Sequence, residues 1–195
     1  MKQPSPAIVK KIQALAKLAA DLRQGRHFNI TRLTVIKSFC SDPEAAAKFA
    51  VYIAKLAQRQ FKARLSGDTE PTIWQQYGQL IDAAILAMTH DLKSPTEETK
   101  SKLRELYKLA TEAQNRIERR QWGYVRHIEC GDLLMVETAM ESLLNPQYAP
   151  LNAYQMARQY SERYDPHHGT GLIPTSAPMV EEIVAFWERH FLDRG

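Results

Sequence analysis

Two adjacent histidines, His167 and His168, stand in the least helix-like part of the chain, residues 164–178, with Asp165 two residues before them. Imidazole nitrogens and a carboxylate oxygen are ligands that zinc accepts, but a zinc site needs at least three protein ligands in fixed geometry. A distant residue would have to complete this set. We therefore expect no metal and no cofactor, and interpret the segment as an ordered loop that leads into a C-terminal helix. The alternative is a loop that lines a site for a small ligand or a substrate.

A second group of residues interleaves arginines with aromatic rings in the stretch NRIERRQWGYVRH. A guanidinium group can hold phosphate or carboxylate through two parallel hydrogen bonds, and flat rings can stack on planar ligands. Arg119 and Arg120 follow Arg116 by three and four residues, so a helix would present all three on one face. We predict a surface for an anionic or protein partner; the alternative is a solvated basic face that nearby acids neutralise. Its members are Arg116, Arg119, Arg120, Trp122, Tyr124 and Arg126.

The remaining reactive side chains form no recognisable catalytic set. His127 lies three residues before Cys130 and would share a helix face with it, but a buried cysteine beside a half-exposed histidine explains this pair equally well. Cys40 and Cys130 lack the close spacing of a zinc or redox motif. Patterns for zinc peptidases, phosphate-binding loops, dinucleotide binding, serine hydrolases and di-iron bundles are missing from the sequence. We assign no catalytic residue.

The elements that must position these residues are helices, because apolar residues recur at three and four positions almost throughout. We predict an all-α fold, a single domain (residues 1–195) of seven or eight helices with short connections. Ser41 or Asp42 should cap one helix, and Ser94 should cap another with Pro95 in its first turn. The expected helices cover about 6–24, 30–39, 43–65, 72–92, 95–122, 124–144, 152–164 and 176–192. The helix at 72–92 is among the most apolar, and we expect it at the centre.

Composition places the chain among globular proteins, with 44% hydrophobic and 25% charged residues. The longest unbroken apolar stretches, residues 49–54 and 83–88, are far too short for a transmembrane helix, which needs about 20 residues. Two prolines near the N-terminus are unfavourable for a secretory leader. We expect a cytoplasmic protein without a transmembrane segment.

Charge is sorted along the chain. Residues 1–40 carry eight basic and one acidic residue, residues 41–100 seven and eight, residues 101–128 seven and three, and residues 129–195 four and ten. Such sorting indicates either a basic surface for an anionic partner or two ends that attract one another in the fold. The N-terminal segment 1–40 could also form a semi-independent unit.

The sequence therefore favours a non-enzymatic helical protein that acts by binding another macromolecule, as an adaptor, assembly factor or regulator. This hypothesis depends on the missing catalytic set, the sorted charge, and a helical surface rich in Tyr and Arg, which are favoured at binding hot spots. A protein partner is the first expectation, nucleic acid is the alternative, and self-association stays open. The third reading is an enzyme or ligand-binding protein that uses the loop with His167 and His168.

Overall fold

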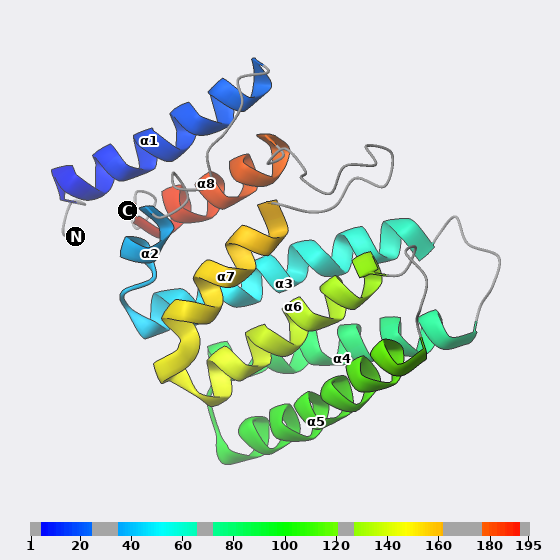
Figure 1. Cartoon of the computed structure of the whole chain (residues 1–195). Helices are drawn as coiled ribbons and strands as arrows, with labels where there is room; N and C mark the ends of the chain where they lie inside the picture. Colours follow the sequence, from blue (N-terminus) through cyan, green and yellow to red (C-terminus); the bar gives the residue numbers. More distant parts are fainter. Residues whose placement is uncertain (1–4, 25–34, 66–71, 121–126, 162–176, 192–195) are drawn as a thin grey trace.

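The computed structural model describes residues 5–24, 35–65, 72–120, 127–161 and 177–191, which are almost entirely helical and include no strand (Figure 1). This confirms the prediction of an all-α fold with seven or eight helices. The helices are α1 (Pro6–Arg23), α2 (Val35–Phe39), α3 (Pro43–Leu65), α4 (Thr72–Lys93), α5 (Glu97–Arg120), α6 (His127–Leu144), the short 3-10 helix η3 (Pro146–Tyr148), α7 (Ala149–Ser161) and α8 (Ala177–Phe191). None of the described helices combines the length and the hydropathy needed to cross a bilayer.

Asp42 caps the start of α3, and the sequence predicted either this residue or Ser41 in that role. The backbone N–H groups of Glu44 and Ala45 donate to its two carboxylate oxygens, both at 3.2 Å. These are N–H groups of the first turn, which have no partner within the helix. The helix then runs to Leu65, as its periodicity predicts.

The start of α5 differs from the prediction that Ser94 caps it and Pro95 opens it. The helix begins at Glu97, and Thr96 just before it forms a reciprocal pair of hydrogen bonds with Thr99 in its first turn. The N–H of Thr99 donates to Oγ1 of Thr96 at 3.1 Å, and the N–H of Thr96 donates to Oγ1 of Thr99 at 3.0 Å. Two backbone donors are satisfied this way, as in a capping box.

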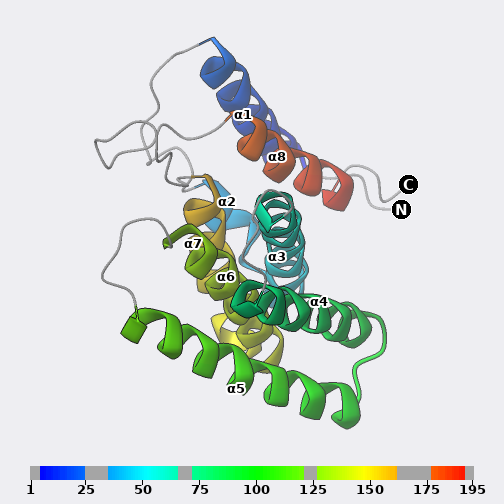
Figure 2. The ribbon, with the colours of Figure 1, turned by 90° about the vertical axis from the view of Figure 1, so that its right-hand side faces the viewer.

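The helices form three layers in the view of Figure 2. The pair α1 and α8 lies on one side, α4 and α5 lie on the other, and α3, α6 and α7 lie between them. Phe49, Ile53 and Phe61 of α3 are at most 1% exposed. The central helix is therefore α3. The expectation that α4 is central was wrong, since α4 lies in an outer layer and exposes Leu86 at 65%.

The two ends of the described chain pack against each other. Helix α1 lies along α8 (Figures 1 and 2), with Ile12, Leu15 and Ala19 buried in the contact layer. At one end of this pair the guanidinium group of Arg23 donates two hydrogen bonds to the carboxylate of Glu181. The basic first segment and the acidic last segment thus attract one another at this point.

Large rings join α8 to the middle layer. Trp187 is completely buried, with its ring centroid 4.8 Å from that of Phe49 in α3 and 5.1 Å from that of Phe39 in α2. Phe191 stacks on Trp187 at 5.4 Å. Aromatic contacts of this kind stabilise a fold through the area they bury and through ring geometry. They hold the α1–α8 layer on α3.

Candidate binding surface

The two surfaces predicted from sequence lie largely outside the described residues. Asp165, His167 and His168 lie there entirely, as do Trp122, Tyr124 and Arg126 of the arginine group. Arg119 and Arg120 belong to the last turn of α5, but their side chains are not among those described. Both surfaces therefore stay predictions.

Arg116 is the member of this group whose side chain is described. It is exposed on α5, and no ion pair joins it to another described residue. Two other cations of α5 differ from it: Lys102 pairs with Glu105 at 2.8 Å, and Arg104 pairs with Glu97 at 3.5 Å. Carboxylates thus neutralise Lys102 and Arg104, whereas Arg116 has no ion pair with a described residue.

A basic surface that we did not predict runs along α3. Its side chains are Lys48, Lys55, Arg59 and Lys62, which we call the α3 basic row. Their spacing of seven, four and three residues places them on one side of the helix. At 1.5 Å per residue the row is about 21 Å long. All four side chains are exposed or half-exposed.

Both ends of the α3 basic row are neutralised by carboxylates. Near the start of α3, Lys48 forms an ion pair with Glu44 one turn before it. Near the other end, Lys62 lies 2.9 Å from Oδ1 of Asp82 in α4, an oxygen that also accepts a hydrogen bond from Gln58 at 2.6 Å. Asp82 thus ties α4 to this side of α3.

At the centre of the row the positive charge has no matching acid among the described residues. Lys55 and Arg59 of α3 lie near Lys93, the last residue of α4, and we call these three residues the cation cluster. Within the described chain none of the three forms an ion pair. Burial, then the charge of Lys93, then that of Arg59 lower the pKa of Lys55. Like charges therefore face each other here, and an anion would relieve their repulsion.

Tyr52 borders the α3 basic row on the side of α8. Its hydroxyl group donates to Oε2 of Glu182 at 2.5 Å and accepts from the guanidinium group of Arg189 at 3.2 Å. Arg189 also lies over the tyrosine ring, 5.6 Å from its centroid. Burial, and next the hydrogen bond to Glu182, raise the pKa of the Tyr52 hydroxyl. Arg189 is engaged locally and adds little to the open charge of the cation cluster.

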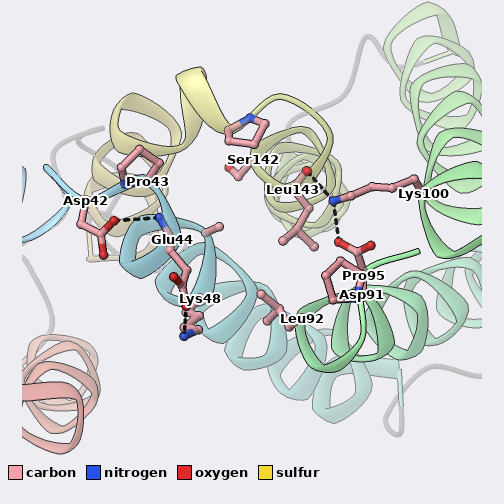
Figure 3. Close-up of a pocket in the computed structure, with 12 residues that line it drawn as sticks. Asp42, Pro43, Glu44, Lys48, Asp91, Leu92, Pro95, Lys100, Ser142 and Leu143 are labelled. Carbon is pink, nitrogen blue, oxygen red and sulfur yellow. Dashed lines mark hydrogen bonds and ion pairs between the residues drawn. The ribbon is translucent and has the colours of Figure 1, made fainter. Parts of the chain in front are cut away.

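A pocket of about 490 Å³ opens where the starts of α3 and α5 meet the ends of α4 and α6 (Figure 3). On its wall Nζ of Lys100 lies 2.6 Å from Oδ2 of Asp91 and donates to the carbonyl oxygen of Leu143 at 2.8 Å. Thr99 donates to the other oxygen of Asp91 at 2.7 Å. The size suits a small ligand, but these polar groups already satisfy one another, so their first role is to join three helix ends.

Cys40, the cysteine whose side chain is described, is not a reactive thiol. Cys40 is fully buried, and burial raises its pKa to about 12, so it is protonated at neutral pH and a poor nucleophile. The side chain of Cys130 is not described, so its pairing with His127 is not tested. No group of three or more His, Cys, Asp or Glu side chains in the described part of the chain is arranged to hold a metal ion.

The α3 basic row had a signal in the sequence, namely Lys and Arg at helical spacing from position 48 to position 62. No signal in the sequence links Lys93 to this row, because only the fold brings the end of α4 to the middle of α3. Comparison with known proteins adds nothing to this surface: no family model, no curated protein and no solved structure matches the chain.

Proposed function

We propose that this protein is a non-enzymatic binding protein, an adaptor, assembly factor or regulator, and that the cation cluster is its contact with an acidic partner. The observation that carries the proposal is the contrast along the α3 basic row. Lys48 and Lys62 have carboxylate partners, whereas the cations between them have none in the described chain.

A structural role explains this contrast less well. Lys93 at the end of α4 interacts favourably with the helix dipole, which accounts for one cation of the cluster. It does not account for Lys55, which is half-buried between two like charges that oppose its own protonation. An arrangement that costs free energy in the isolated protein is typical of functional sites, where a ligand supplies the missing charge.

Capture of partners by the full-length chain tests the proposal. The variant Lys55→Glu/Arg59→Glu/Lys93→Glu reverses the cluster, and Lys102→Glu/Arg104→Glu/Lys108→Glu makes the same change in net charge on the exposed side of α5. We expect partners that the first variant loses and the second retains, after nuclease treatment and with circular dichroism showing both variants folded. Equal losses in the two variants, or none in either, would contradict a specific site.

The end of α5 supports a second candidate function, nucleic-acid binding. Arg116 is exposed and has no ion pair with a described residue, and Arg119 and Arg120 follow it at helical spacing. Phosphate contacts of this kind make affinity fall steeply with salt. A captured nucleic acid whose binding is indifferent to salt would remove this candidate.

The proposal includes a cytoplasmic location. The thiol of Cys40 is free and buried, and reduced cysteines are usual in that compartment.

A further inference from the structure

Leu86 is the most exposed large hydrophobic side chain of the described residues, at 65%. It lies in α4 four residues after Asp82 and seven before Lys93, so the three side chains share one face of the helix. Asp82 reaches Gln58 and Lys62 of α3 from this face. Leu86 therefore lies beside α3, between Asp82, which neutralises one end of the α3 basic row, and the cation cluster. We call this exposed strip, from Asp82 through Leu86 to the cation cluster, the α3–α4 seam.

The charges around Leu86 suit a compact anionic segment better than a long polyanion. A nucleic-acid strand laid along the α3 basic row would meet the carboxylate of Glu44 at one end and that of Asp82 at the other. Because these carboxylates already neutralise Lys48 and Lys62, the two ends would not attract the strand, and only the centre of the row would. Two or three carboxylates opposite the cation cluster would meet cations and no described acid.

We propose that the α3–α4 seam binds a short acidic amphipathic segment of another protein. An apolar side chain of that segment covers Leu86, and its carboxylates pair with Lys55, Arg59 and Lys93. Amphipathic helices commonly bind in this way, with apolar anchors at helical spacing and charges that fix the register. Arg59 can hold a carboxylate through two parallel hydrogen bonds. This inference rests on the proposed function and adds the chemistry of the partner.

Selection from random peptides tests this chemistry without a known partner. The full-length chain is presented with phage-displayed peptides of about 16 residues, enough for four helical turns. Enriched peptides are then measured by fluorescence anisotropy against the wild type and three variants. These are the charge reversal Lys55→Glu/Arg59→Glu/Lys93→Glu, the anchor variant Leu86→Ser, and Leu151→Ser as a matched control. Leu151 is also highly exposed, at 55%, but belongs to α7.

We expect enriched peptides with Asp or Glu three or four positions from a large apolar residue. Leu86→Ser should weaken their binding about tenfold or more, as for a buried anchor at an interface. The charge reversal should abolish binding, and Leu151→Ser should leave it unchanged. Leu86→Ser and Leu151→Ser are exposed substitutions, which rarely disturb the fold. Circular dichroism checks that all three variants are folded.

The possible failures separate the two proposals. Peptides that need the cluster but bind equally well to Leu86→Ser would overturn the amphipathic segment and leave the proposed function standing. Peptides that ignore both variants, or no enrichment at all, would overturn the segment. If the capture experiment then also finds no partner that depends on the cluster, the proposed function falls as well. A labelled single-stranded oligonucleotide that binds the cluster more tightly than every peptide would make the site one for nucleic acid and refute the inference.

Discussion

Replacing Lys100 by methionine should destabilise the fold strongly, because Lys100 is the charged partner of a buried carboxylate. The Asp91 side chain is 2% exposed and that of Lys100 is 24% exposed, with 2.6 Å between Nζ and Oδ2. At an effective dielectric constant of 20 the attraction at this distance is about 6 kcal/mol before desolvation. Loss of one partner of a buried pair typically costs about 3–5 kcal/mol. Since Lys100 is partly hydrated, we expect about 3 kcal/mol.

Urea unfolding followed by circular dichroism measures this loss. Lys102→Met is the matched control, because Lys102 pairs with Glu105 on the surface of the same helix and such pairs are worth about 0–1 kcal/mol. The double variant Asp91→Asn/Lys100→Met should recover much of the stability, since it no longer leaves a buried charge unpaired. A loss below about 1 kcal/mol for Lys100→Met, or full additivity in the double variant, would refute the assigned role.

Three further predictions concern other parts of the chain. Replacing Arg116, Arg119 and Arg120 by alanine should change stability by about 0.5 kcal/mol or less and sharply weaken any anionic partner of that face; a much lower melting temperature would show the arginines to be structural. Trp187→Ala should cost about 3–5 kcal/mol in urea unfolding, because the ring is fully buried, and a loss below about 1 kcal/mol would contradict the packing of α8. In a Cys130→Ser background Cys40 should react with a disulfide reagent only on unfolding: with a pKa of about 12, about one thiol in ten thousand is ionised at pH 8. Rapid labelling of the native protein would contradict this.

Most helices with strong apolar periodicity could be predicted to within a residue or two, but α7 begins at Ala149, three residues before its predicted start. The prediction for α3 matches at both ends, because Asp42 and Pro43 mark its start and buried side chains such as Phe49 and Ile53 recur at helical spacing. Some helix starts were predicted less well. Ser94 was the predicted cap of α5, but the reciprocal bonds between Thr96 and Thr99 start this helix at Glu97.

The cation cluster escaped prediction for two physical reasons. The first reason is that residues 41–100 carry seven basic and eight acidic residues, so the segment as a whole is nearly neutral and indicates no basic surface. Several of those acids stand at helix starts, as Asp42 and Glu44 do, whereas Lys and Arg repeat along the middle of α3. The second reason is tertiary. Lys93 comes from another helix, and no spacing in the sequence places it beside Lys55.

The position of the cation cluster explains why this strip of the central helix faces solvent. Helices α6 and α7 pack against other sides of α3. Along one edge of the strip Tyr52 contacts Glu182 of α8, and along the other edge Lys62 contacts Asp82 of α4. Apolar packing over the strip would bury ammonium and guanidinium groups without counter-charges, which costs several kcal/mol per ion. The cations themselves therefore disfavour covering the α3–α4 seam with another helix of this protein. A partner can cover it without that cost only if it brings carboxylates, and its apolar gain must come from Leu86. The chemistry proposed for the partner thus follows from what prevents the protein from covering α3 with its own helices.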